Sequence, residues 1–380
     1  MHVVINAQLL NTAHTYRGAG VSNYSQNLLS ALGQAGSRHR FTAFLSDPAF
    51  QAEGVTLVRT RWPAHLPPAR ILWEQTALPW ALRRQDAALV HGLVNVLPLA
   101  TSVPGVVTVH DLSFIHMPEK FPPAKRFYLE RLCRASAARA RRIIAVSRQT
   151  ADDLVRCFGV KADRIEVVYN GVAAHFRPEA DRVEMGPPRS LVEVDRPFLL
   201  YVGTLEPRKN LVRLVEAFAR WRQGRPSARE VQLVLAGAKG WYYEEIFQQV
   251  QALELQEVVR FPGFIPTEEL PGWYRAAAAF VYPSLFEGFG LPVVEAMACG
   301  TPVICSDAAS LREVAGDAAL IAPAEDVDAW VAGLDAFFTQ PGLADDLRRR
   351  GLERASRFTW ERAAAETIAV YEAAVRAERR

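Results

Sequence analysis

Two glutamates enclose the segment of the sequence that is best suited to bind an anion, Glu287–Glu295, which reads EGFGLPVVE. Gly288 and Gly290 permit a tight turn, and Pro292 suits the first turn of a helix. The free backbone N–H groups of residues 289–293 then form an anion site at the helix N-terminus. Carboxylates on both sides of a diphosphate suit a ligand with a sugar at one end and a ribose at the other. The alternative is a pair of solvated surface charges.

A second candidate follows a hydrophobic run that ends at Gly203. A short loop brings Arg208 and Lys209 to the start of the next helix. Two cations oppose the dipole at a helix N-terminus, so this placement favours an anion bound between them. Arginine offers a bidentate fork and lysine a mobile charge, and both suit a diphosphate. A merely solvated Arg-Lys pair is the alternative.

Two weaker candidates lie in the N-terminal half. Gly18 and Gly20 stand between an expected strand and an expected helix, but their spacing matches neither GxGxxG nor the P-loop pattern, so an ordinary turn is the alternative. His110 ends a buried-type strand, where its imidazole can donate to a sugar hydroxyl or act on protons near neutral pH. A core or loop histidine is the alternative there, and His91 is the next candidate.

The elements that must position these residues alternate between short apolar runs and longer amphipathic stretches. Many of the runs are continuously apolar, which is typical of parallel strands covered on both faces and joined by right-handed crossovers. The expected strands are 3–6, 41–45, 55–58, 88–91, 105–110, 142–146, 165–169, 198–202, 231–236, 258–261, 279–282, 302–306 and 319–321. The expected helices are 23–33, 123–140, 148–158, 210–222, 243–253, 268–277, 292–298 and 329–339, with a last one from 359.

A polar, proline-rich stretch divides this pattern into two similar halves. The sequence therefore predicts an α/β protein with two Rossmann-like, doubly wound domains that face each other across a cleft. The expected segments are an N-terminal domain 1–175, a linker 176–196, a C-terminal domain 197–358 and a final helix 359–380 that packs across the domain junction. A solvent-exposed tail is the alternative for the final helix.

Composition narrows the class of protein. The 380 residues have a net charge of only +3, which is too small to indicate a nucleic-acid partner. The four cysteines form no CxxC pair, and no apolar run reaches the ~20 residues of a membrane span. We therefore expect a reduced, cytoplasmic protein without a signal peptide. A basic helix over 131–142 with five arginines suits anionic lipid or a lipid-linked acceptor, but a solvated helix face explains it as well.

With these segments in place, the whole chain resembles the retaining glycosyltransferase family 4, which has the GT-B fold. Residues 287–295 are similar to the family's E-x7-E signature, and residues 203–210 to its Arg-Lys phosphate loop; 18–20 depart from its usual glycine loop. The resemblance implies that Arg208 and Lys209 neutralise the leaving diphosphate. It assigns catalysis to His110, Glu287, Arg208 and Lys209. It assigns donor binding to Gly18, Gly20, Gly203, Gly288, Phe289, Gly290, Leu291 and Glu295.

The same resemblance implies the reaction. A hexose passes from a nucleotide-diphosphate sugar to a saccharide or lipid-linked saccharide, with retention, and with neither a metal nor a further cofactor. The chain looks closest to bacterial mannosyltransferases of polysaccharide assembly, so GDP-mannose is the expected donor, with UDP-sugars still open. A nucleotide-sugar epimerase, a phosphorylase and a non-catalytic nucleotide-sugar-binding subunit stay open as alternatives. A dehydrogenase is disfavoured, because neither half has a full GxGxxG followed by an acidic residue.

Overall fold

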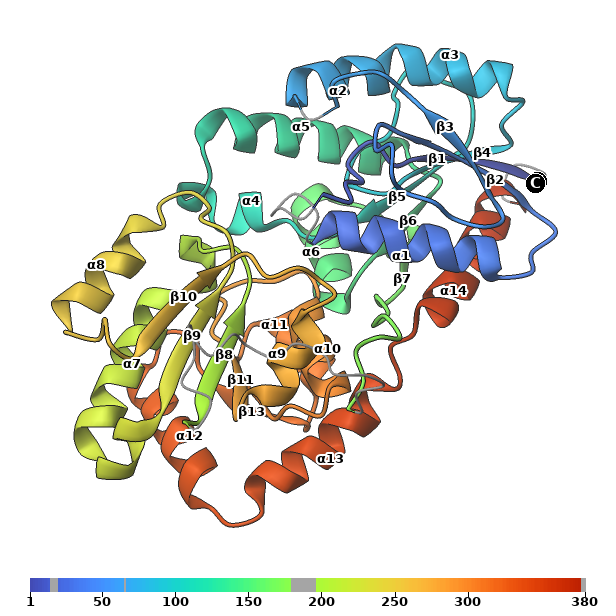
Figure 1. Ribbon diagram of the computed structural model, residues 1–380. Coiled ribbons are helices and arrows are strands. Elements are labelled where there is room, and N and C mark those ends of the chain that lie inside the picture. Colours follow the sequence, from blue (N-terminus) through green and yellow to red (C-terminus); the bar gives the residue numbers. More distant parts are fainter. Residues whose placement is uncertain (14–19, 65, 179–195, 377–380) are drawn as a thin grey trace. The chain divides into compact units, whose positions relative to one another are not determined.

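The chain forms two compact units. The computed structural model describes residues 1–13, 20–64, 66–178 and 196–376. The N-terminal unit consists of Met1–Gly171 together with Thr359–Arg380, and the C-terminal unit is Val172–Phe358 (Figure 1). Gly18 and most of the expected linker lie outside the described residues.

The N-terminal unit is built on a parallel sheet. Within the described residues its order is β3-β2-β1-β4-β5-β6-β7, so the direction of strand progression reverses between β1 and β4. The first strand is buried throughout and pairs on both sides, Val3 with Phe41 and with Leu89, which explains the apolar residues 3–5 at its centre. The strands are β1 (His2–Asn6), β2 (Arg40–Leu45), β3 (Val55–Arg59), β4 (Leu89–Gly92), β5 (Gly105–Val109), β6 (Arg142–Ala145) and β7 (Ile165–Val167).

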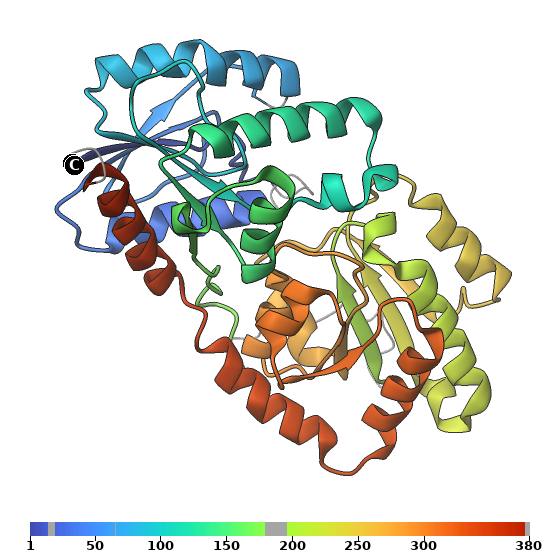
Figure 2. The ribbon, with the colours of Figure 1, turned by 180° about the vertical axis from the view of Figure 1, so that it is seen from behind.

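The helices of this unit include the last helix of the chain. They are α1 (Val21–Gln34), α2 (Pro67–Gln75), α3 (Ala77–Arg84), α4 (Ser113–His116), α5 (Pro123–Arg139), α6 (Arg148–Phe158) and α14 (Trp360–Arg376). Figures 1 and 2 show α14 beside α1, next to the N-terminal sheet. Trp360 and Tyr371 of α14 join Tyr24 and Leu28 of α1 in one buried apolar cluster. The final helix is therefore part of the core of the N-terminal unit.

The C-terminal unit repeats the architecture. Its parallel sheet has the order β10-β9-β8-β11-β12-β13 within the described residues, and strand progression reverses between β8 and β11. Its strands are β8 (Phe198–Val202), β9 (Gln232–Ala236), β10 (Val259–Gly263), β11 (Ala279–Tyr282), β12 (Val303–Ser306) and β13 (Ala319–Ala322). Its helices are α7 (Leu211–Gly224), α8 (Glu244–Ala252), α9 (Leu270–Ala276), α10 (Leu291–Ala298), α11 (Ala309–Ala315), α12 (Val327–Thr339) and α13 (Leu343–Ala355).

The structure confirms the two Rossmann-like sheets and each expected strand, with ends that shift by one or two residues. The expected basic helix over 131–142 is wrong in its extent. The helix ends at Arg139, and Arg142 begins β6. Arg139 also turns inward, since its guanidinium donates to the carbonyls of Thr101 and Val103, both at 2.7 Å. Among the described residues no helix is long and apolar enough to cross a membrane.

Candidate functional site

The two strongest sequence signals meet at the point where the strand order of the C-terminal unit reverses. The loop with Arg208 follows β8, and the loop with Glu287 follows β11, its neighbour in the sheet. A backbone hydrogen bond from the N–H of Leu285 to the carbonyl of Arg208 joins the loops at 3.0 Å. Doubly wound sheets bind ligands at this position, beyond the carboxyl ends of their strands.

The loop after β8 is held in a fixed shape by a tight backbone contact and by Asn210. A Cβ on Gly237 would lie 1.8 Å from the carbonyl oxygen of Gly203, so the ends of β8 and β9 approach too closely for a side chain at position 237. Residues Pro207–Lys209 form a 3-10 turn, and Asn210 follows in the left-handed conformation with φ 59°. The Asn210 carboxamide donates to the carbonyl of Ala324 at 2.7 Å. These contacts fix the direction in which Arg208 and Lys209 leave the backbone.

Two cations and two carboxylates form a compact cluster at this site. The Arg208 guanidinium lies 2.9 Å from an oxygen of Glu206 and 3.1 Å from one of Glu287. Lys209 Nζ lies 2.6 Å from the other oxygen of Glu287 and donates to the Tyr282 hydroxyl at 2.7 Å. Formal charge is balanced within the cluster, so the cations are already positioned by carboxylates before any anion binds.

The cluster is buried, so the alternative of solvated surface charges is wrong for both segments. Side-chain exposure is 15% for Arg208, 8% for Lys209 and 9% for Glu287. Burial alone would raise the pKa of Glu287, but the charges of Arg208 and Lys209 outweigh burial and hold that pKa at about 2. Glu287 is therefore ionised at neutral pH and paired with two cations.

The turn between Glu287 and α10 has the form that its glycines indicate. Gly290 precedes the helix with φ 98°, and a Cβ there would lie 2.5 Å from a methyl carbon of Leu311. The Ser310 hydroxyl donates to the carbonyl of Glu287 at 2.7 Å. Phe289 and Gly288 are buried beside this turn. The start of α10, at Leu291, thus lies one short turn after the charged cluster.

Glu295, the second glutamate of the signature, lies inside α10 and is only 6% exposed. Its carboxylate accepts a hydrogen bond from the Tyr274 hydroxyl at 3.1 Å. Burial raises the pKa of Glu295 to about 7, in spite of this hydrogen bond. The two glutamates of one signature therefore have opposite electrostatic environments, and their pKa values differ accordingly.

We expect Glu295→Gln to stabilise the protein above neutral pH. The folded protein retains a proton on Glu295 that the unfolded chain releases near 4.5, so this group's stabilising contribution is complete below pH 4.5 and is lost as pH rises through about 7. At pH 8 the variant should exceed the wild type by about 3 kcal/mol, and the gap should shrink toward pH 5. Urea unfolding at both pH values measures it. Glu325→Gln, which changes a 76% exposed carboxylate, is the control and should show no such gap.

His110 lies in the N-terminal unit, directly after β5. Its Nε2 lies 2.9 Å from the carbonyl oxygen of Leu93, and its ring packs edge-on against Tyr24. Burial lowers the pKa of His110, which favours the neutral imidazole. Because a carbonyl can only accept, Nε2 carries the proton and Nδ1 keeps the lone pair. The side chain can therefore accept a hydrogen bond at Nδ1 from a bound hydroxyl.

The other N-terminal candidates have different outcomes. His91 is fully buried, and its ring nitrogens lie 2.6 Å from the Tyr371 hydroxyl and 2.9 Å from Thr108 Oγ1, so it is a core residue. Gly20 precedes α1 with φ 57°, which suits glycine. Gly18 lies outside the described residues, and the contact of this loop with phosphate stays a prediction.

Three further residues of the site escaped the sequence reasoning. Glu206 forms an ion pair with Arg208. The Tyr282 hydroxyl accepts a hydrogen bond from Lys209, and the Tyr274 hydroxyl donates one to Glu295. Glu206 carried a signal, since it stands two residues before Arg208 in the same loop. The tyrosines carried none, because an aromatic residue in an apolar run is most simply a core residue.

Within the described part of the chain, the atoms of His116, Asp153 and Cys157 lie within 4.8 Å of one another. Asp153 already accepts from Arg156 at 2.7 Å and lies 3.1 Å from His116. These three residues belong to the N-terminal unit, whereas Arg208 and Glu287 belong to the C-terminal unit. We read it as an ion-pair group and assign it no metal.

Comparison with known proteins identifies the class. Residues 187–354 match the model of glycosyl transferases group 1, and residues 18–176 match that of Glycosyltransferase Family 4. The chain superposes on sucrose-phosphate synthase from Thermosynechococcus elongatus with a TM-score of 0.81, 25% identity and 99% coverage of both chains. Fold and matched models define a glycosyltransferase of the GT-B type.

The sequence relatives narrow the class further. The chain is 35% identical to O-antigen chain mannosyltransferase B of Escherichia coli, over 77% of this chain and 76% of the relative. It is 34% identical to a D-inositol 3-phosphate glycosyltransferase of Streptomyces bingchenggensis, over 63% of this chain and 54% of the relative. The chain belongs to glycosyltransferase family 4.

Proposed function

We propose that this glycosyltransferase moves mannose from GDP-mannose, with retention, to a saccharide or lipid-linked saccharide. The observation that carries the proposal is the buried Arg208–Lys209 pair, held by Glu287 at the reversal of strand order in the C-terminal sheet. Two fixed cations beside the start of α10 suit the two phosphates of a nucleotide-diphosphate sugar. The similarity to O-antigen chain mannosyltransferase B supports mannose as the hexose.

The proposed step forms one glycosidic bond and breaks another. The acceptor oxygen attacks C1 of the hexose on the face from which the diphosphate departs. The C1–O bond to the β-phosphate breaks, its electron pair stays on that phosphate oxygen, and this oxygen takes the acceptor proton. The products are the new glycoside and the nucleoside diphosphate, and no protein carboxylate acts as nucleophile. Arg208 and Lys209 stabilise the charge that develops on the leaving group.

The other residues have supporting roles in this proposal. In this proposal Glu287 holds both cations in place and accepts a hydrogen bond from a donor hydroxyl. Glu295 accepts from the ribose hydroxyls. Since Arg208, Lys209 and the start of α10 are proposed to bind the diphosphate, we expect full transfer in excess EDTA. A strict requirement for a divalent ion would contradict this part of the proposal.

A thermal-shift panel tests the donor site. GDP, UDP and ADP and their sugar conjugates are added to the protein with and without EDTA. A ligand at ~100 times its Kd adds ~2.7 kcal/mol, or roughly 5–10 °C for a unit of this size. We expect a selective shift with GDP and GDP-mannose. A selective shift with UDP-sugars would make a UDP-sugar, rather than GDP-mannose, the proposed donor. The absence of any shift would contradict the nucleotide site.

Turnover assays with the same donors separate the main alternatives. An epimerase converts the donor sugar with no acceptor present, and a phosphorylase requires phosphate. A non-catalytic subunit shows the shift but transfers nothing to any acceptor. The D-inositol 3-phosphate glycosyltransferase relatives make inositol phosphates worth including among the acceptors.

His110→Ala should lower kcat roughly 10- to 100-fold, since a buried hydrogen bond to the transferring sugar is lost. The GDP affinity should remain within twofold, because Arg208, Lys209 and Glu295 belong to the C-terminal unit. Initial rates and a GDP titration measure the two quantities. His116→Ala, an exposed histidine six residues on, is the matched control. Unchanged turnover in His110→Ala would leave His110 with a structural role only.

A further inference from the structure

Four buried polar side chains form a hydrogen-bonded series through the core of the N-terminal unit. The Tyr371 hydroxyl of α14 lies 2.6 Å from Nδ1 of His91 on β4. The Nε2 atom of His91 lies 2.9 Å from Oγ1 of Thr108 on β5. The same Thr108 oxygen lies 3.0 Å from the hydroxyl of Tyr24 on α1. This series, which we call the Tyr24 network, therefore joins the last helix of the chain to α1.

The Tyr24 network ends against the ring of His110. The rings of Tyr24 and His110 pack edge to face, with centroids 4.6 Å apart and an angle of 88° between their planes. Trp360 of α14 packs against Tyr24 as well, at 5.8 Å between centroids. Tyr24 is thus held by Thr108 at its hydroxyl and by Trp360 at its ring, so it presents a fixed surface to the imidazole.

The hydrogen bonds of His110 fix its backbone and one ring nitrogen. Its N–H donates to Asn95 Oδ1 at 3.0 Å, and its carbonyl accepts from Thr150 Oγ1 at 3.2 Å. Its Nε2 donates to the carbonyl of Leu93 at 2.9 Å. A ring that is held at one nitrogen can still rock about its side-chain torsions. The packing of Tyr24 restricts this motion, and with it the direction in which Nδ1 points.

Apolar side chains would fill the four positions of the network without the cost of burying polar groups. Burial and the nearby His110 lower the pKa of His91 to about 3, so His91 is neutral and carries one ring proton. A neutral imidazole has one donor and one acceptor nitrogen, which matches a hydroxyl on each side. Because buried polar networks with bonded members restrict their side chains to one arrangement, the Tyr24 network adds a directional restraint to ordinary core packing.

We propose that Tyr24 is a positioning residue for His110, and that the Tyr24 network carries this restraint from α14 to the imidazole. The network holds Nδ1 in the direction in which it accepts a hydrogen bond from a hydroxyl of the transferring hexose. The inference rests on the proposed function, because it requires His110 to contact that sugar. It gives α14 a role in the reaction that acts through Tyr371 and His91.

Kinetics of two network variants test this role. Thr108→Val replaces the central hydroxyl by a methyl group of similar size, and Tyr24→Leu removes the ring that packs on His110. We expect kcat for transfer to fall about fivefold in Thr108→Val and about tenfold in Tyr24→Leu, since the hydrogen bond from the sugar to Nδ1 becomes poorly aligned. The GDP affinity should stay within about twofold in both, because the proposed donor residues belong to the C-terminal unit.

A double-mutant cycle distinguishes positioning from a general loss of structure. In a His110→Ala background, Thr108→Val and Tyr24→Leu should lower kcat no further, because they act through the imidazole. Losses of the same size with and without the imidazole would overturn the inference. Tyr24→Phe keeps the ring and removes only its bond to Thr108, so it should recover most of the kcat that Tyr24→Leu loses.

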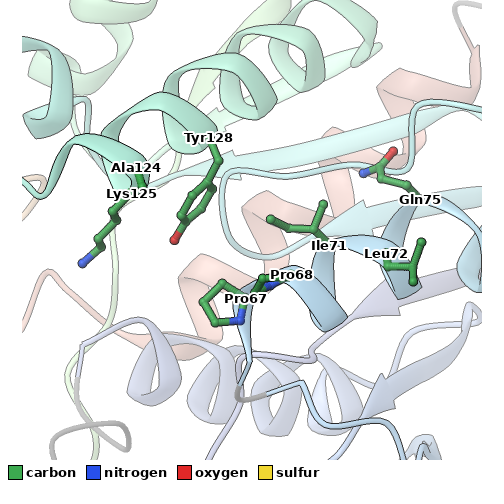
Figure 3. A pocket seen from close by; sticks show the side chains of 8 residues that line it. All are labelled: Pro67, Pro68, Ile71, Leu72, Gln75, Ala124, Lys125 and Tyr128. Atoms are coloured by element: carbon green, nitrogen blue, oxygen red, sulfur yellow. The ribbon is translucent and has the colours of Figure 1, made fainter.

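Matched controls remove the same groups elsewhere in the N-terminal unit. Thr42→Val breaks a buried contact of the same kind, since Thr42 Oγ1 on β2 lies 2.8 Å from Nε2 of His2 on β1. Tyr128→Phe removes a hydroxyl from the wall of a pocket of about 850 Å³ between α2 and α5 (Figure 3). The residues that line this pocket are all distinct from those of the Tyr24 network. Both controls should keep the wild-type kcat, and a loss in Thr42→Val as large as that in Thr108→Val would overturn the inference.

Nitrogen NMR of the imidazoles gives a readout that does not depend on transfer. The His110 signals, assigned by their loss in His110→Ala, should show the proton on Nε2 in the wild type and in Thr42→Val. Thr108→Val and Tyr24→Leu should instead show a mixture of the two neutral forms. Unchanged His110 signals in both network variants would overturn the inference. If no acceptor supports transfer, the proposed function fails, and the same spectra still decide whether the network holds His110.

Discussion

Arg208→Ala should lower the rate of glycosyl transfer about 10²- to 10³-fold, as expected for the loss of one fixed donor to a developing negative charge, roughly 2.7–4 kcal/mol. The guanidinium is held by Glu206 and Glu287 and also donates to the carbonyl of Phe286 at 2.7 Å. In the proposed mechanism, the guanidinium is therefore in position for the leaving diphosphate without reorganising. Single-turnover rates with labelled donor, with a thermal melt as folding check, measure the effect.

Two further variants serve as comparisons for Arg208→Ala. Arg208→Lys keeps the charge but loses the planar fork that spans two carboxylates, so it should recover only part of the rate. Arg220→Ala removes a 51% exposed arginine on α7 of the same unit and should transfer at the wild-type rate. Near-normal turnover in Arg208→Ala would remove this residue from the mechanism.

Glu287→Gln should both stop transfer and destabilise the C-terminal unit. The change leaves Lys209 buried without the carboxylate at 2.6 Å and takes from Arg208 one of its two counter-charges. Breaking a buried ion pair costs about 3–5 kcal/mol, which lowers the melting temperature of a unit of this size by on the order of 10 °C. Turnover should fall more than about 100-fold, because the cations lose their positions.

The physical reason for this loss predicts a rescue. We expect GDP or inorganic pyrophosphate to bring negative charge to the two cations, so either anion should recover part of the lost melting temperature. Glu325→Gln breaks an exposed pair with Arg213 and should melt within about 2 °C of the wild type, with or without anion. A Glu287→Gln protein that melts and transfers like the wild type would show that the cluster is not needed.

The strands could be predicted from the sequence because of their burial. In a parallel sheet with both faces covered, a strand such as β8 is apolar at successive positions, which no loop or amphipathic helix imitates. The helices α2, α3, α4, α11 and α13 were not predicted. The apolar residues of α2 lie partly on its exposed face, and α13 is rich in charge and buries only Leu347, Gly351 and Ala355. The apolar residues of α2 are divided between two faces, and the buried stripe of α13 contains one leucine and two small residues, so neither gives the strong apolar pattern on which helix prediction depends.

The two segments of the candidate site could be predicted from the sequence, but the contacts between their residues could not. The loops with Arg208 and Glu287 each have a local signal, since glycine, proline and charge fall at fixed spacings. The contact between Lys209 and Glu287 joins residues 78 positions apart. It exists because β8 and β11 are neighbours, and strand order is a property of the whole sheet. The opposite pKa shifts of Glu287 and Glu295 depend in the same way on partners from other strands and helices.

Because α14 belongs to the core of the N-terminal unit, it determines which of the two units can complete its folding first during synthesis. The N-terminal unit receives its last helix only after all of Val172–Phe358 has left the ribosome. Until then, the surfaces of Tyr24 and Leu28 that Trp360 and Tyr371 cover are exposed to water, and His91 lacks the Tyr371 hydroxyl. The second unit is contiguous in sequence, so all of its residues are present once Phe358 has been added. A nascent chain can therefore complete its C-terminal unit first, and a chain cut short at Phe358 leaves exposed the apolar surfaces of α1 that α14 covers.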